Sequence, residues 1–500
     1  MKAINIILYT ALASLTLSGC ELDIDPISDA TELTEGTQTE ESSAVLKDRQ
    51  AALDQRLNLY EQFRNRQEHW SLDMKLIADC HSDNGYAGTT GAEVVPYETN
   101  SIDASNSVLS RDWTRYLEDI AKANVLINGL DDLKNKGLVS DAEYNQWKAE
   151  GKIFRAIIMF DMARIWGTFP VITDIARTIT SDNVEEVFPT YFPPRTESAE
   201  CYAQIISDLE DGELNAPDFS ATDRTILTKT VAQAMLAKVY AEKPIQDYSK
   251  VIEYAEKVRN TAGLELEPDF ATLWGYDDEK KDCLKRNTSE GILEVQWTTG
   301  NANWESWMYG RCLEDYEYYF TWAKWVTPSR DLIEDFTKEG DEVRFNETVV
   351  YYECTWSNYY PASHYPFMYK MRSGFNNYYK LRLADIILLE AEAYAYQGQN
   401  SKAAELVNII RNRAKLNNID DSGDMIEKVL HERRLELAFE GQRWFDLCRN
   451  GKVEQYMNAV FSKDNGRLAQ KRTFDANSYL LPIPQTALDE NVNLEQNPGY

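Results

Sequence analysis

Two stretches of the chain share the pattern of paired short helices that pack closely on each other. In residues 381–395, apolar and small side chains recur at the 3.6-residue spacing of an amphipathic helix, and residues 403–414 repeat this pattern after a short turn. Residues 231–241 and 251–259 form a second copy, with small residues at matching positions. Helix–turn–helix units of this kind are typical of tetratricopeptide-like repeats. The chain is therefore predicted to be mainly α-helical, on a tetratricopeptide-like repeat scaffold.

An unrelated helical bundle is the alternative to this scaffold. Three further segments are helical by period: residues 45–66, 109–132 and 141–166. Residues 263–380 differ, because they contain many turns, 26 of the 58 aromatic residues and short β-branched runs. We interpret them as an irregular, loop-rich insertion with minor β-strands, at residues 292–297 and 347–352.

The first twenty residues predict the compartment. Lys2 precedes the apolar run of residues 4–17, which fits a secretory signal and is short for a membrane span. The run ends in Leu-Ser-Gly-Cys20, which resembles the lipobox of bacterial lipoproteins; a plain signal peptide is the alternative. We expect cleavage before Cys20 and acylation of that cysteine, since several acyl chains anchor a protein stably. Residues 28–43, rich in Ser, Thr and Glu, predict a flexible tether.

No later run reaches 18 apolar residues, so no membrane-spanning segment is expected. The chain is predicted to consist of a signal peptide, an acylated cysteine with its tether, an N-terminal helical region, the aromatic-rich insertion and a C-terminal region. Their bounds are residues 1–19, 20–44, 45–262, 263–380 and 381–500.

The charge balance excludes one class of partner. Among 500 residues, 52 Lys and Arg stand against 82 Asp and Glu, a net charge of −30, whereas nucleic-acid binding needs a positive surface. The balance argues less strongly against a polyanionic ligand held by a broad basic surface. Four scattered histidines and the absence of zinc-type spacing predict no metal site, and no cofactor motif is present. The six cysteines besides Cys20 are expected as buried free thiols, with disulfides as the alternative.

Three segments carry a family resemblance. Residues 151–170 form a helix ending in Trp-Gly-Thr-Phe-Pro, where Trp166 replaces the family's tyrosine. Residues 432–451 match the family's charged helix almost position for position, and residues 481–500 match its C-terminal signature, which ends in Asn-Pro-Gly-Tyr. With the lipobox, these segments resemble the SusD/RagB family of Bacteroidetes outer-membrane nutrient-binding lipoproteins. The resemblance covers essentially the whole mature chain.

The resemblance implies a SusD-like helical fold and a non-catalytic role without a cofactor. The protein would capture an oligosaccharide or polysaccharide and deliver it to a SusC-like TonB-dependent outer-membrane transporter. Its lipid anchor would hold it on the outer membrane, facing outside. Two alternatives remain open: a surface glycoside hydrolase with an Asp/Glu pair, and a peptide-binding transporter lid.

Charges alternate in sign at three- and four-residue spacing through residues 432–449. We predict intrahelical ion pairs along a single helix. A catalytic alternative would use Glu440 and Asp446 as paired carboxylates. Nearby arginines would keep both ionised, which suits a salt-bridge network better than a general acid. No catalytic residue is therefore predicted.

Five of the 12 tryptophans lie in the window from Trp297 to Trp325. Aromatic plates bind the flat C–H faces of sugars, while nearby polar groups bond the rim of hydroxyls. Trp297, Trp322 and Trp325 are expected in the core. Trp304 and Trp307 lie in a Gly/Asn-rich loop, where core packing is harder to arrange, and are better candidates for ligand contact.

In the resembled family, glycan is also bound by the irregular loop after the first helix, which here spans residues 79–107. The sequence does not name the sugar. The predicted glycan-binding candidates are Asp83, Asn84, Tyr86, Tyr97, Asn100, Asn301, Trp304, Trp307, Tyr309, Arg311 and Trp356.

Overall fold

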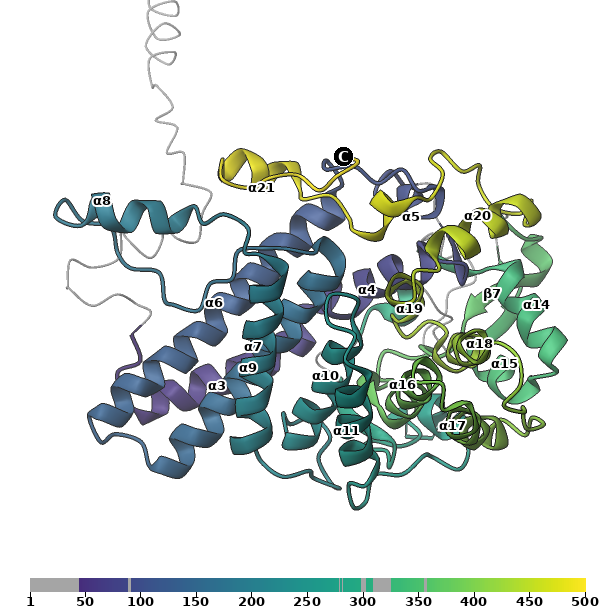
Figure 1. The fold of residues 1–500 in the computed structure, drawn as a ribbon, viewed down its shortest axis with the longest axis horizontal. Helices are drawn as coiled ribbons and strands as arrows, with labels where there is room; N and C mark the ends of the chain where they lie inside the picture. Colours follow the sequence, from purple (N-terminus) through teal and green to yellow (C-terminus); the bar gives the residue numbers. More distant parts are fainter. Residues whose placement is uncertain are drawn as a thin grey trace, which may run out of the picture. The chain divides into compact units, whose positions relative to one another are not determined.

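The computed structural model is predominantly helical, and residues 46–500 form one compact unit (Figure 1). In the part of the chain that it describes, no helix is both long and apolar enough to span a membrane. The predicted boundaries at residues 262 and 380 stay predictions. The described residues are 45–88, 91–277, 279–280, 282–297, 303–308, 325–354 and 358–500.

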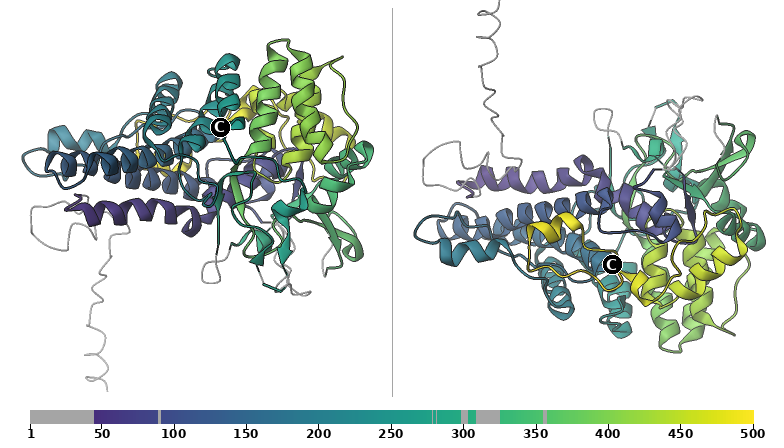
Figure 2. Two further views of the ribbon diagram at one scale, coloured as in Figure 1. Left: turned by 90° about the horizontal axis from the view of Figure 1, so that it is seen from below. Right: turned by 90° about the horizontal axis from the view of Figure 1, so that it is seen from above.

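Four long helices form the N-terminal half: α3 (Arg49–Asn65), α6 (Ser107–Asn135), α7 (Asp141–Trp166) and α9 (Ser198–Asn215). Helix α7 packs against both α6 and α9, and α3 runs alongside α6 and α7 (Figure 2). Gly212 lets α9 approach α7, because a Cβ atom there would lie only 2.5 Å from Cγ1 of Ile153. A capping box of Ser140 and Glu143 begins α7.

The two predicted helix pairs are present and adjacent. They are α10 (Lys229–Ala241) with α11 (Tyr248–Arg259), and α16 (Leu383–Tyr396) with α17 (Asn400–Arg413). Helix α11 packs on α16, so the pairs stack although the whole irregular region separates them in sequence. Tyr248 and Tyr396 stack across this junction with ring centroids 4.4 Å apart. The repeat-scaffold prediction is confirmed.

The described strands form four two-stranded antiparallel sheets. The predicted strands at residues 292–297 and 347–352 correspond to β4 and β6. The pairs are β1 (Gly85–Ala87) with β5 (Val326–Pro328), β2 (Tyr276–Asp277) with β3 (Asp282–Cys283), β4 (Gly291–Val295) with β8 (Tyr378–Arg382), and β6 (Val349–Tyr352) with β7 (Tyr365–Met368).

Shorter elements complete the fold. The α-helices are α4 (Asp73–Lys75), α5 (Val95–Thr99), α8 (Val184–Val187), α12 (Ala271–Trp274), α13 (Glu305–Met308), α14 (Arg330–Glu339), α15 (Glu342–Thr348), α18 (Met425–Leu437), α19 (Arg443–Arg449), α20 (Val453–Lys463) and α21 (Gln485–Glu490). The π-helices are η1 (Glu68–Leu72) and η2 (Leu76–Cys80), and the 3₁₀-helices are η3 (Phe188–Tyr191), η4 (Ala362–His364) and η5 (Ala476–Tyr479).

The prediction of one continuous charged helix over residues 432–449 is wrong. Helix α18 ends at Leu437, and α19 begins only at Arg443. Between them, Phe439 and Gly441 adopt positive φ angles of 62° and 75°, which no α-helix contains. The expected intrahelical ion pairs reduce to Arg449 with Asp446, 2.9 Å apart.

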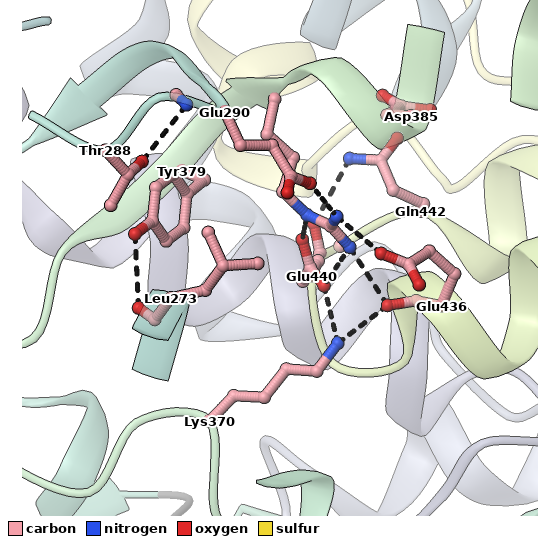
Figure 3. A network of polar contacts seen from close by, with 12 residues as sticks. Leu273, Thr288, Glu290, Lys370, Tyr379, Asp385, Glu436, Glu440 and Gln442 are labelled. Carbon is pink, nitrogen blue, oxygen red and sulfur yellow. Dashed lines mark hydrogen bonds and ion pairs between the residues drawn. The ribbon is translucent and has the colours of Figure 1, made fainter. Parts of the chain in front are cut away.

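The charges are instead buried and paired between elements. Arg382, at the end of β8, contacts Glu440, Glu436 and Glu290 at 2.6, 2.6 and 2.7 Å. Lys370 adds a contact of 2.5 Å to Glu440, and Figure 3 shows both residues close to Glu436. Three- and four-residue spacing places charges on one face of a helix. When that face is buried, its charged side chains form ion pairs with the elements that cover it.

The described cysteines are free, which confirms that prediction for them. Cys80, Cys201, Cys283 and Cys354 are buried, and Cys448 is half-buried.

Arg382→Met is expected to destabilise the protein by about 3–5 kcal/mol, because it leaves buried carboxylates without their shared cation. Arg177→Met is the control. Arg177 pairs with Glu186 on the surface, and loss of this pair should lower the free energy of unfolding by less than about 1 kcal/mol. Urea unfolding measures both variants. Equal losses would contradict the central role of Arg382.

Candidate ligand-binding face

The regions predicted to bind glycan lie together in the structure. Strand β1, from the loop of residues 79–107, pairs with β5, which ends the tryptophan-rich window. The N–H of Gly88 donates to the carbonyl of Trp325 at 3.4 Å, and Nδ2 of Asn358 donates to the carbonyl of Gly88 at 2.9 Å. Three segments far apart in sequence therefore meet at Gly88.

The five candidates within residues 79–107 are nevertheless buried, each at most 1% exposed: Asp83, Asn84, Tyr86, Tyr97 and Asn100. These side chains are therefore not accessible in this structure, and their role as ligand contacts stays a prediction. The polar side-chain groups of four of them bind the protein itself, whereas the buried hydroxyl of Tyr97 has no hydrogen-bond partner among the described residues.

Asp83 is bound by two arginines of the charged segment. Nε and Nη2 of Arg443 each donate to its carboxylate at 2.8 Å. Burial raises the pKa of Asp83, but the charges of Arg434 and Arg443 outweigh it and hold the pKa far below its ordinary value. Asn84 donates to Asp79 at 2.9 Å and accepts from Arg434 at 3.0 Å. Both side chains thus fasten the loop to the C-terminal region.

The other three candidates are equally structural. The hydroxyl of Tyr86 donates to Asp464 at 2.5 Å, and its ring stacks on Tyr359 at 4.7 Å. The carbonyl of Tyr97 accepts from the imidazole of His81 at 2.6 Å. Asn100 donates to the carbonyl of Arg472 at 2.9 Å. Arg434 and Arg443, in the charged segment of residues 432–449, are the sequence feature from which burial of this polar loop could have been predicted.

Trp304 is the candidate that the structure leaves accessible, with 52% of its surface exposed. Its backbone N–H donates to Oε1 of Gln67 at 2.8 Å, and the N–H of Asn303 donates to the carbonyl of Gly374 at 2.8 Å. Glu305 forms a buried ion pair with Lys75 at 2.7 Å. An exposed indole therefore stands on a backbone fixed from three directions.

Trp297 is fully buried, and Trp325 packs against the core, as predicted. Several other predicted residues lie outside the described part of the chain: Cys20, Asn301, Tyr309, Arg311, Cys312, Trp322 and Trp356. The side chain of Trp307 also lies outside it.

A cleft of about 870 Å³ borders the segments that hold Trp304. Phe63 and Arg64, on the last turn of α3 just before Gln67, line one wall. Phe375, next to Gly374, lines another, and Gln296 stands at the end that follows β4. A more apolar cavity of about 520 Å³ is lined by residues of α7, α9 and α19, and none of the predicted ligand residues lines it.

The carboxylates of the catalytic alternative are held in ion pairs. Glu440 contacts Arg382 and Lys370, and Asp446 contacts Arg433 at 2.9 Å. Although burial raises the pKa of Asp446, the charges of Arg433 and Arg449 keep it below its ordinary value. This arrangement favours a structural role for both residues. Among the described residues, no group of His, Cys, Asp and Glu has the geometry of a metal site.

The fold is that of the SusD superfamily. A laminarin-binding SusD-like protein has a TM-score of 0.71 at 22% identity, covering 91% of this chain and 100% of its own. Surface glycan-binding protein A from Bacteroides fluxus has a TM-score of 0.72 at 20% identity, covering 90% and 99%.

The sequence comparisons agree with this class. Residues 363–500 match the SusD family model, and residues 32–241 match a model described as starch-binding, associating with outer membrane. SusD-like protein P2 of Formosa agariphila is 29% identical over 473 residues, covering 86% of this chain and 88% of the relative. The chain belongs to the SusD-like family, which confirms the resemblance drawn from its motifs.

His81 provides a test of the loop's burial. It is 1% exposed, Nδ1 donates to Tyr97, and burial lowers the pKa of His81 from 6.5 to about 4. A lowered pKa in the folded state gives stability that is fully present above pH 6.5 and is lost as the pH falls toward 4. The loss amounts to about 3 kcal/mol at 1.36 kcal/mol per pH unit.

Unfolding free energies measured between pH 7 and 4 should therefore fall less steeply in His81→Gln than in the unsubstituted protein. His364→Gln is the control, because His364 is exposed. Identical pH slopes in all three proteins would show that His81 titrates normally and that the loop is not closed in solution.

Proposed function

We propose that this protein is a non-catalytic glycan-binding lipoprotein that captures an oligosaccharide or polysaccharide at the outer membrane. Membership of the SusD-like family supports this, as does the similarity of the fold to solved proteins described as laminarin-binding and surface glycan-binding. The observation within this chain that carries the proposal is Trp304, a half-exposed indole on a fixed backbone.

The physical basis is desolvation of an aromatic face. A sugar ring presents a flat C–H face to an indole, while its hydroxyls bond polar groups at the edge. A platform that is already ordered loses little conformational entropy on binding, so more of the contact energy appears as affinity. The bonds from Gln67 and Gly374 provide this order around Trp304.

The finer parts of the proposal concern location and partner. Acylation of Cys20 would hold the protein on the outer membrane, facing outside, where it would pass glycan to a SusC-like TonB-dependent transporter. The family model described as associating with outer membrane supports the location. Cleavage of a bound glycan would favour a glycoside hydrolase instead. Selective binding of peptides from a library would favour a peptide-binding lid.

Trp304→Ala is expected to weaken glycan binding by about 1–3 kcal/mol and to leave the fold intact, because the indole contributes to stacking and little to the core. Affinity electrophoresis against laminarin, starch and a wider glycan panel selects the ligand, and calorimetry measures the change.

Trp297→Ala is the matched control, because removing this buried indole should lower the free energy of unfolding by about 3–5 kcal/mol. Full affinity in Trp304→Ala, in Trp307→Ala and in the double variant would move the site away from this loop. Unfolding of Trp304→Ala would show that its indole belongs to the core.

Cys20→Ala is expected to abolish lipidation and release the protein from the membrane fraction, because the lipobox cysteine accepts the acyl chains. Labelled palmitate and membrane fractionation test this. Retention of label in the variant would contradict anchoring through Cys20.

A further inference from the structure

The cleft that borders the segments holding Trp304 is lined by charges of both signs. Three carboxylates line it: Asp223, Asp282 and Glu294. Each is already engaged by neighbouring groups. Four cations also line it: Arg56, Arg64, Lys280 and Arg286.

The carboxylates are bound locally. Glu294 is 1% exposed and accepts from the N–H and hydroxyl of Thr288, both at 2.8 Å, and from Gln296 at 2.9 Å. Asp282 pairs with Arg286 at 2.6 Å. The carboxylate of Asp223 accepts from the N–H and hydroxyl of Thr225 at 2.9 and 2.7 Å. Both bonds to Asp223 reach Oδ1, so this exposed carboxylate keeps its second oxygen for solvent, whereas Glu294 and Asp282 are bound more fully.

Three of the four cations have ion-pair partners within the described part of the chain, and Arg64 is the exception. Arg56 is bound by Glu150, and Lys280 pairs with Asp277 at 2.8 Å on the surface, where ion pairs are weak. Arg64 has neither a hydrogen-bond acceptor nor an ion-pair partner among the described residues. A half-buried guanidinium without an acceptor is poised to bind a planar or tetrahedral anion, since arginine binds such groups through two parallel hydrogen bonds.

The rest of the cleft suits a sugar. Phe63 and Phe375 provide apolar surface, and Asn287 and Gln296 provide amides for hydroxyls. The volume of about 870 Å³ lies within the usual range of ligand sites, roughly 300–1,000 Å³. Gln67 and Gly374, which fix the backbones of Trp304 and Asn303, lie close in sequence to the cleft-lining residues Arg64 and Phe375, so we expect one extended ligand to reach both the indole and the cleft.

We propose that this cleft binds an acidic substituent of the captured glycan, a uronate carboxylate or a sulfate ester, through Arg64. The inference rests on the glycan-binding function proposed above and names the class of glycan. The cleft thus distinguishes acidic from neutral polymers, whereas Trp304 accepts either.

The experiment uses the full-length folded protein without its lipid, with alginate and polygalacturonate as uronate probes, carrageenan as the sulfate probe, and laminarin as the neutral probe. We expect at least one acidic polymer to bind more tightly than laminarin, with an affinity that falls as salt rises. Arg64→Gln should weaken that binding about 5- to 10-fold and leave neutral binding unchanged. Arg177→Gln, on an exposed pair outside the cleft, should change neither.

The four probes and the variants distinguish failure of this inference from failure of the proposed function. Tighter binding of the uronates or of carrageenan identifies which anion Arg64 takes. Binding of neutral glycan that depends on Trp304, with no preference for acidic polymers or no effect of Arg64→Gln, overturns this inference and leaves the proposed function standing. Failure of the unsubstituted protein to bind any glycan of the full panel overturns both. Circular dichroism confirms that each variant is folded.

Discussion

The buried guanidinium of Arg382 is the contact on which the remaining architecture depends. It stands where strand β8 leads into helix α16, and it binds Glu290 before β4 together with Glu436 and Glu440 around the end of α18. A charge removed from water is tolerated only when its partners are in place. The irregular insertion, the second repeat and the C-terminal family segment must therefore reach their final positions together.

The same principle connects the scaffold to the ligand-binding face. The break between α18 and α19 turns two backbone N–H groups, of Phe439 and Gly441, toward the carboxylate of Asp79 at 3.0 and 3.2 Å. Arg443, the first residue of α19, binds Asp83. The loop that carries β1 is thus held by residues about 360 positions later in the chain. The positive φ angles at Phe439 and Gly441, unfavourable in isolation, are compensated by these buried contacts.

The sequence predicted those features that depend on local pattern. Helical periodicity identified the repeat pairs, and the Gly/Asn-rich surroundings of Trp304 predicted its exposure. Two features were not predicted, because local pattern does not reveal the partner. Alternating charges in residues 432–449 fit intrahelical pairing as well as pairing with distant elements, and burial selected the second. Asp83 and Asn84 have the composition of an exposed loop, but two arginines from the charged segment draw them inside.

Net charge is similarly uninformative about a single cleft. The value of −30 describes a field that repels an approaching polyanion, but at physiological salt that field is screened beyond about 8 Å. Arg64 acts at contact distance, inside walls where screening is weaker than in bulk water. The two effects divide the recognition of an acidic glycan: the overall charge limits the rate of encounter, and the cleft determines how long the bound ligand stays. A strongly acidic surface and selectivity for an acidic ligand are therefore physically compatible, provided that the ligand meets an unpaired cation beside an aromatic platform.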